Sequence, residues 1–159
     1  RQYLKKCKKM ADKNHMRVTV LGDPRAFDED IQESIREIEE YSAKYDEHFF
    51  QIALNYGSRD EIKRAVNHIA DDVRAGKITG EITEDMISSY LDTAGLPDPD
   101  LLIRTSGEER LSNFLMWQLA YTEFYFTDVP WPEFDKAEFE KAIAKYNQRD
   151  RRYGGVKEE

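Results

Sequence analysis

Hydrophobic and polar positions along the chain follow two periods, one typical of strands and one typical of helices. Short apolar runs rich in aromatic and β-branched residues predict four strands, at residues 16–23, 48–57, 101–103 and 123–128. Apolar residues spaced three and four apart predict helices at residues 1–14, 28–45, 58–76, 83–95, from about 113, and 135–155. Strands that alternate with helices favour a parallel sheet.

Capping residues and turn signals refine these elements. Ser58 and Thr83 stand where helix caps are expected, and the "LPDPD" segment predicts an extended turn before residue 101. The buried stripe of the helix over 58–76 is predicted to contain Ile62, Val66, Ile69 and Val73. We therefore expect an α/β fold, a three-layer, mostly parallel central sheet flanked by helices, in a single domain over residues 1–159.

Composition narrows the classes of function. The 159 residues carry a net charge of -8, which argues against general nucleic-acid binding, because a phosphate backbone requires a basic face. A single cysteine, Cys7, cannot form an internal disulfide and indicates a reducing compartment; its place on an amphipathic helix favours packing over catalysis. No apolar run approaches the ~20 residues that cross a bilayer, so we expect a soluble protein that can still visit a membrane surface.

The segment "RTSGEERLSN" after the third strand carries the clearest candidate chemistry. Arg104 and Arg110 can offer planar forks of donors to phosphate oxygens, and Gly107 allows a close turn of the backbone. Ser112 stands where a helix N-cap would place its hydroxyl and the first free amides toward the same anion. The residues alone leave another interpretation open, in which Ser112 is an ordinary cap and both arginines pair with Glu108 and Glu109 on the surface.

Glu123 is an acid in a densely apolar and aromatic neighbourhood, between "FLMWQLAY" and "FYF". A carboxylate is costly to bury unless a cation, a metal ion or hydrogen-bond donors compensate it. Its spacing fits either a carboxylate that caps a turn at a helix end or a Mg²⁺ ligand or arginine partner.

The run "DLLIRTSGEERLSNFLMWQLAYTEFYFTDVPWPEF" closely resembles the carboxyl-terminal signature of the cis-prenyltransferases, most of all the bacterial undecaprenyl diphosphate synthases. The stretches "RVTVLGD", "ALNYGSRDEI" and "RDRRYGG" resemble further family segments in the same order. The resemblance implies a Mg²⁺-dependent enzyme that condenses isopentenyl diphosphate with an allylic diphosphate such as farnesyl diphosphate. The implied product is a long polyprenyl diphosphate with cis double bonds, as used in cell-wall lipid-carrier synthesis.

The resemblance also implies roles for particular residues. Arg104, Arg110 and Ser112 would hold the diphosphate of isopentenyl diphosphate, with Leu111 between them in the loop, and Glu123 would contribute to the Mg²⁺ site. The R-x-G tail, Arg152 and Gly154, would reach the active site of the partner in a homodimer. Asn55, Gly57 and Arg59 match family positions around the floor of the active site, where their roles are less defined.

The family's Asp-Gly-Asn-Gly-Arg-Trp loop, whose aspartate is the principal catalytic group, is absent, as is its Phe-Ser-x-Glu-Asn-Trp segment. Both are expected upstream of Arg1, so we expect this chain to be the last two-thirds of the catalytic domain and to be inactive alone. We expect the protein to be in the cytoplasm and to contact the inner face of the plasma membrane at most transiently, during product release. An alternative is a non-catalytic partner subunit of a two-component cis-prenyltransferase, although such partners usually lack the arginines that are present here.

Overall fold

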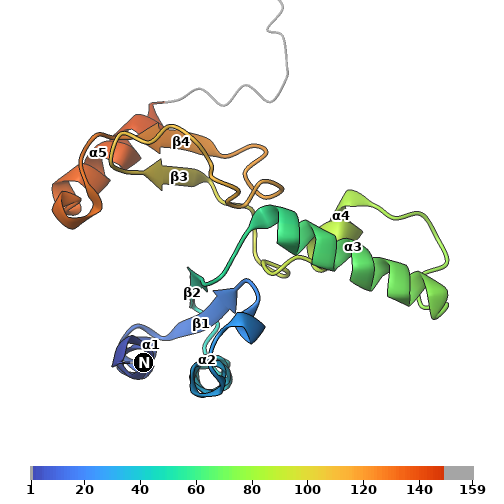
Figure 1. Ribbon diagram of the computed structural model, residues 1–159. Helices are drawn as coiled ribbons and strands as arrows, with labels where there is room; N and C mark the ends of the chain where they lie inside the picture. Colours follow the sequence, from blue (N-terminus) through green and yellow to red (C-terminus); the bar gives the residue numbers. More distant parts are fainter. Residues whose placement is uncertain (1, 149–159) are drawn as a thin grey trace, which may run out of the picture. The chain divides into compact units, whose positions relative to one another are not determined.

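The structure is a computed structural model of the chain, and it describes the backbone of residues 2–148 and the side chains of residues 6–148 (Figure 1). Contacts divide the chain into two compact units, residues 1–96 and 97–159. Throughout the described part, no helix combines the length and the apolar character needed to cross a bilayer.

The first unit alternates helices with two strands. In chain order its elements are α1 (Gln2–Asn14), β1 (Met16–Leu21), the single-turn η1 (Pro24–Ala26), α2 (Glu29–Ser42), β2 (His48–Ala53), α3 (Ser58–Arg74) and α4 (Glu84–Ser89). β1 and β2 are parallel, with Met16 opposite His48 and Leu21 opposite Ala53. The predicted strands and helices of this unit are therefore confirmed, although two helices are shorter than predicted: α2 ends at Ser42 and leaves Tyr45 beyond it, and α4 ends at Ser89 instead of residue 95.

The core of the first unit lies where α1 and α2 pack against β1. Its fully buried members come from all three elements: Cys7, Ala11, Val18, Ile35 and Ile38. The predicted packing role of Cys7 is confirmed, because only 1% of this residue is exposed. Burial also raises the pKa of its thiol, which disfavours the reactive thiolate.

The edge of β1 that faces away from β2 is closed by side chains of α2. The amide of Val18 donates to Ser42 Oγ, and the amide of Val20 donates to a carboxylate oxygen of Glu39, both at 2.9 Å. Ser42 is fully buried, and its hydroxyl donates in turn to the carbonyl of Ile38 at 2.7 Å. These bonds satisfy strand amides that no neighbouring strand reaches.

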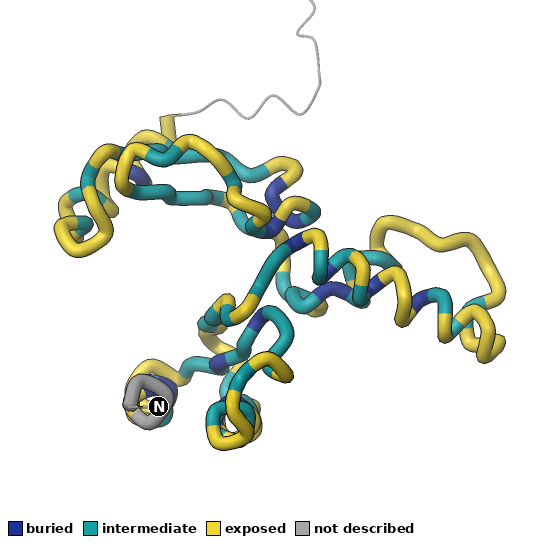
Figure 2. Tube along the Cα trace, in the orientation of Figure 1, coloured by how far each residue is buried: buried dark blue, intermediate teal, exposed yellow. Residues whose placement is uncertain are grey.

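The predicted buried stripe of α3 is largely wrong. Its buried residues are Ser58, Glu61, Ala65 and Ile69, whereas Val66 and Val73 are 54% and 43% exposed. Figure 2 shows buried and exposed positions alternating along this helix. The buried face is rotated because the Glu61 carboxylate accepts bonds from the Tyr56 hydroxyl and the Asp92 amide, which allows an acid to occupy a core position.

The two predicted helix caps in this unit have different outcomes. Ser58 is the first residue of α3, and Gly57 occupies the cap position instead. Thr83 does cap α4, because its hydroxyl accepts a bond from the Met86 amide at 3.2 Å.

The second unit contains β3 (Leu101–Arg104), β4 (Glu123–Phe126), the single-turn η2 (Trp131–Glu133) and α5 (Lys136–Asn147). The two strands are parallel, with Leu101 opposite Glu123 and Arg104 opposite Phe126, and α5 packs beside β4 (Figure 1). Asp135 caps α5 by accepting a bond from the Glu138 amide at 3.0 Å. Parallel strands and flanking helices in both units confirm the α/β fold class.

The helix predicted from about Asn113 does not form, and residues 112–121 are a series of turns. Ser112, Asn113 and Leu115 have φ angles of 50°, 62° and 44°, in the left-handed region. Three such residues so close together interrupt the right-handed hydrogen-bond ladder. The apolar spacing that suggested a helix instead buries Leu115 and Leu119 from a compact loop.

Candidate functional site

The loop after β3 is anchored by backbone bonds that extend the pairing with β4. The Thr127 amide donates to the Arg104 carbonyl, and the Gly107 amide donates to the Thr127 carbonyl, each at 3.0 Å. Gly107 has a φ of 67°, and a Cβ there would lie 3.0 Å from a carboxylate oxygen of Asp128. A glycine is therefore favoured at this close turn, as the sequence predicted.

The guanidinium of Arg104 bridges the beginning and the end of the loop. Its Nη1 donates to the carbonyl oxygen of Arg110, and its Nη2 donates to Ser112 Oγ at 3.2 Å. Leu111 lies between these two residues and is half-buried. The structure thus brings together Arg104, the backbone of Arg110 and the hydroxyl of Ser112.

The side chain of Arg110 has a different partner. It forms an ion pair with Glu108, and 67% of the arginine side chain and 40% of the glutamate side chain are exposed. The surface-pairing interpretation therefore describes Arg110 but not Arg104, which binds a carbonyl and a hydroxyl. Because exposed ion pairs contribute only ~0–1 kcal/mol, a multiply charged anion can replace Glu108 at little cost.

The predicted cap role of Ser112 is wrong, since no helix begins after it. Ser112 is exposed, and its hydroxyl accepts a bond from Arg104 instead of from amides of a following helix turn. The donors available to an anion here are consequently guanidinium groups and the hydroxyl, without a helix N-terminus behind them.

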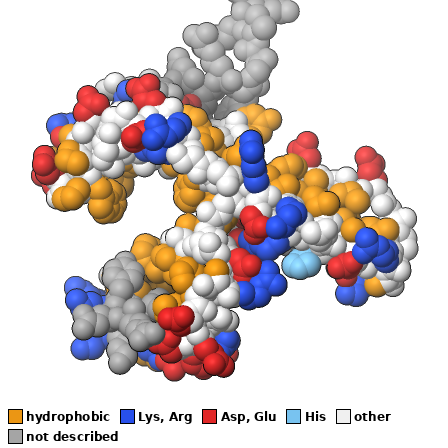
Figure 3. All heavy atoms as spheres, viewed as in Figure 1, with side chains coloured by type: hydrophobic (Ala, Val, Ile, Leu, Met, Phe, Trp, Pro, Cys, Tyr) orange, Lys and Arg blue, Asp and Glu red, His pale blue; other side chains and the backbone are white. Residues whose placement is uncertain are grey.

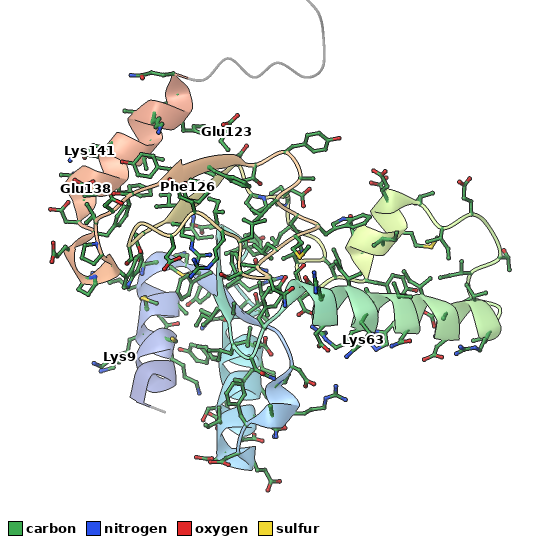
Figure 4. All side chains as sticks on the ribbon, turned by 45° about the horizontal axis from the view of Figure 1, so that its top comes forward. Lys9, Lys63, Glu123, Phe126, Glu138 and Lys141 are labelled. Carbon is green, nitrogen blue, oxygen red and sulfur yellow. The ribbon has the colours of Figure 1, made fainter. Side chains whose placement is uncertain are left out.

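Glu123 lies at the other end of the strand pair. It is the first residue of β4, opposite Leu101, whereas Arg104 is opposite Phe126 three residues further along (Figure 4). At a rise of ~3.3 Å per residue, Glu123 is about 10 Å along the strand direction from Arg104. The structure therefore does not bring Glu123 into the loop, and its start-of-strand position excludes the helix-end interpretation.

Possible metal ligands do not gather elsewhere either. In residues 2–148, no three or more His, Cys, Asp or Glu side chains lie close enough to hold a metal ion together. The R-x-G residues Arg152 and Gly154 lie outside the part of the chain that the structure describes.

A second set of polar residues lies at the carboxyl ends of β1 and β2. The carboxylate of Asp92 receives Arg64 Nη1 and Nη2 at 2.8 and 2.6 Å, and also the Gly22 amide at 2.8 Å. These bonds raise the pKa of Arg64 further above its ordinary value. No local pattern in the sequence marks Asp92, but the helical spacing of Glu61 from Ala65 and Ile69 could have placed Glu61 on the buried face.

Two of the three family-matched residues of this unit lie at the same strand ends. Asn55 follows β2 with a left-handed φ of 47°, and its side-chain amide donates to the Asp23 carbonyl at 3.0 Å. Gly57 caps α3, and Arg59 is in the helix's first turn. The carboxylate of Asp23 accepts bonds from the side chain and the amide of Arg25, which lower its pKa to about 2.

An α/β chain whose parallel strands end in polar loops belongs to the class of folds that bind ligands beyond the carboxyl ends of their strands. Comparison with known families is more specific. Residues 1–154 match the prenyltransferase family described as "Putative undecaprenyl diphosphate synthase", and the chain belongs to this family.

Individual relatives agree with this family. An isoprenyl transferase of Agrobacterium fabrum is 51% identical over 148 residues, covering 92% of this chain and 60% of that protein. A tritrans,polycis-undecaprenyl-diphosphate synthase (geranylgeranyl-diphosphate specific) of Thermoplasma volcanium is 48% identical over 143 residues, covering 89% and 55%. The crystal structure of lavandulyl diphosphate synthase from Lavandula x intermedia, in complex with dimethylallyl diphosphate, superposes with a TM-score of 0.90 at 35% identity, covering 97% and 67%. The chain thus spans roughly three-fifths of the length of the curated relatives it matches.

Proposed function

We propose that this chain is the part of a cis-prenyltransferase that holds isopentenyl diphosphate for condensation with an allylic diphosphate. Farnesyl diphosphate is the proposed allylic substrate, and a long polyprenyl diphosphate such as undecaprenyl diphosphate is the proposed product, made in the cytoplasm. The observation that carries this proposal is the Arg104 guanidinium at the end of β3, directed across its loop to Ser112.

The relatives' names support a diphosphate as the ligand of this loop. One name specifies geranylgeranyl diphosphate and another structure contains dimethylallyl diphosphate, so the prenyl groups differ while the diphosphate is common to both. Two arginines and a hydroxyl offer donors complementary to the several negative charges of the diphosphate.

The loop can bind such a ligand without rearranging its backbone. A guanidinium carries five N–H donors, and Arg104 uses donors of two nitrogens to hold the Arg110 carbonyl and the Ser112 hydroxyl. Further donors remain for phosphate oxygens. Arg110 reaches the same ligand by exchanging its exposed carboxylate partner, Glu108, for a phosphate.

Mg²⁺ is the proposed cofactor, and Glu123 is the proposed protein ligand in this chain. Mg²⁺ is usually held by one or two carboxylates, with phosphates and water completing its octahedron, so a single glutamate fits. Because Glu123 is at the far end of β4 from Arg104, it would act with ligands from outside residues 2–148. When bound, the ion would stabilise negative charge on the leaving diphosphate.

A homodimer is the proposed assembly, with Arg152 and Gly154 directed to the partner's active site. This part of the proposal rests on the R-x-G sequence in a member of this family.

Kinetics of Arg110→Ala in the complete protein test the proposed ligand. Removal of one charged phosphate contact should raise the KM for isopentenyl diphosphate roughly tenfold to hundredfold and lower turnover, with the fold intact by circular dichroism. Glu108→Gln is the matched control, because it removes the competing carboxylate but keeps both arginines. It should leave the KM unchanged or lower it about twofold. Unchanged kinetics for Arg110→Ala would remove this residue from the proposed site.

A further inference from the structure

A stripe of lysines runs along the exposed face of α1. Lys6, Lys9 and Lys13 are all exposed and are spaced i, i+3 and i+7, which places them on one side of the helix. The opposite side carries Cys7 and Ala11, which are buried in the core of the first unit. Figure 4 shows Lys9 projecting away from the body of the unit, and Figure 3 shows Lys and Arg atoms gathered beside this end of the chain.

This lysine stripe differs from every other lysine whose side chain the structure describes. Six of the others form ion pairs with acids: Lys8, Lys44, Lys63, Lys77, Lys136 and Lys141. Lys145 lies over the ring of Tyr125, 5.4 Å from its centroid. No acidic side chain among residues 6–148 forms an ion pair with Lys6, Lys9 or Lys13. In a chain of net charge -8, the three cations on this helix face thus form no ion pair with the acids among the described residues.

The dimensions of the stripe favour a surface over a small ligand. Lys13 stands seven positions after Lys6, which places the two about 10 Å apart along the helix at 1.5 Å per residue. Flexible lysines along a convex helix suit a plane of negative charges.

We propose that the lysine stripe of α1 docks the protein on an anionic lipid bilayer. The choice of a bilayer rests on the proposed function, because a long polyprenyl diphosphate has an apolar chain that must pass from the enzyme into a membrane. Docking through exposed lysines is electrostatic, reversible and weakened by salt, and it requires no inserted segment.

The test is binding of the complete protein to vesicles of phosphatidylglycerol and phosphatidylcholine, with pure phosphatidylcholine vesicles as the neutral comparison. A lysine near an anionic bilayer contributes about a fivefold gain in binding, so Lys6→Gln/Lys9→Gln/Lys13→Gln should bind about a hundredfold more weakly. The matched control is Lys136→Gln/Lys141→Gln/Lys145→Gln, which removes the same charge from α5 and should change binding less than about threefold. Circular dichroism should show that both variants are folded.

Several outcomes would overturn the proposal. One is equal binding of the wild-type protein to neutral and anionic vesicles. Another is an equal loss of vesicle affinity in the two triple variants. The third is binding of duplex DNA through the stripe without binding of vesicles. Condensation measured without vesicles separates this proposal from the proposed function. If the protein binds vesicles through the stripe but has no condensation activity, docking is supported and the proposed reaction is refuted. If the protein is active but does not bind anionic vesicles, the reaction is supported and docking is refuted.

Discussion

The carboxyl ends of the two strand pairs use arginine in opposite ways. At the end of β1 and β2, Arg64 is held by both oxygens of Asp92, and these side chains are only 22% and 15% exposed. At the end of β3, Arg104 is held by a carbonyl and a hydroxyl, and Arg110 by an exposed carboxylate. Both ends are places where α/β proteins bind ligands, yet only the second leaves positive charge uncompensated by a buried acid.

The difference teaches that an arginine's partners indicate its role better than its position does. A bidentate carboxylate neutralises Arg64 and, through the same carboxylate, holds the Gly22 amide, so this arginine stabilises the fold. Neutral acceptors fix the direction of Arg104 without cancelling its charge. If Arg104 binds the proposed diphosphate, its side chain is already oriented, which would reduce the entropy lost on binding.

The largest expected effect is that of Arg104→Ala on catalysis by the complete protein. Loss of an oriented guanidinium that binds a diphosphate should lower kcat/KM for isopentenyl diphosphate by about 100- to 1000-fold. Urea unfolding should shift by less than about 1 kcal/mol, because the lost bonds are exposed. The kcat/KM of Arg104→Lys, which keeps the charge but not the planar fork, should lie between those of the wild type and Arg104→Ala. Full activity in Arg104→Ala would show that the arginine at the end of β3 has no greater role in ligand binding than the arginine at the end of β1 and β2.

A smaller effect is expected from Asp92→Ala, and on stability instead of ligand affinity. Arg64 and the Gly22 amide would lose their acceptor in a half-buried setting, which should cost about 2–3 kcal/mol in urea unfolding. Asp60→Ala is the control, since Asp60 also contacts Arg64 but is 45% exposed, and it should destabilise the protein much less than Asp92→Ala. Equal losses of unfolding free energy in the two variants would mean that the Asp92 bonds stabilise the fold no more than the exposed Asp60 contact does.

The smallest expected effect concerns Asp23, beside the same strand ends. The Arg25 bonds lower its pKa to about 2 from an ordinary 3.8, and Arg25→Ala should return it toward 3.8 in a carboxyl-carbon NMR titration. Because the native carboxyl is more acidic than the unfolded one, its stabilising contribution is complete above about pH 4 and disappears as the pH falls toward 2. Addition of salt should weaken the shift, since 77% of the Arg25 side chain is exposed. An unshifted Asp23 in the wild-type protein would contradict the pairing.

Much of this fold could be predicted from the sequence because its elements have strong periods and short connections. The four strands and the helices around them were predicted, since β-branched runs and three-to-four spacings are local signals. The turns over 112–121 were not, because an apolar sequence that buries Leu115 and Leu119 from left-handed turns has the same composition as a helix. Tertiary contacts decided between the two.

The candidate site shows the same division. The resemblance identified Arg104, Arg110 and Ser112, and the structure brings them into one loop, although their role in binding stays a prediction. The residues alone could not separate Arg104 from Arg110, because the choice between a carbonyl and Glu108 as partner depends on how the loop folds. Asp92 was missed for a similar reason, since its partners Gly22 and Arg64 are 70 and 28 residues away in sequence.

The closed edge of β1 has a consequence for the chain during synthesis and refolding. A strand with bare amides can bind an extended segment of another molecule and start aggregation. On β1, Val18 and Val20 already donate to Ser42 and Glu39, so such a segment would have to displace side chains of α2 before it could pair. Addition of further strands to the sheet of the first unit is thereby directed to β2. Two polar side chains of α2 thus leave the β2 edge as the side on which a further strand can pair with this small sheet.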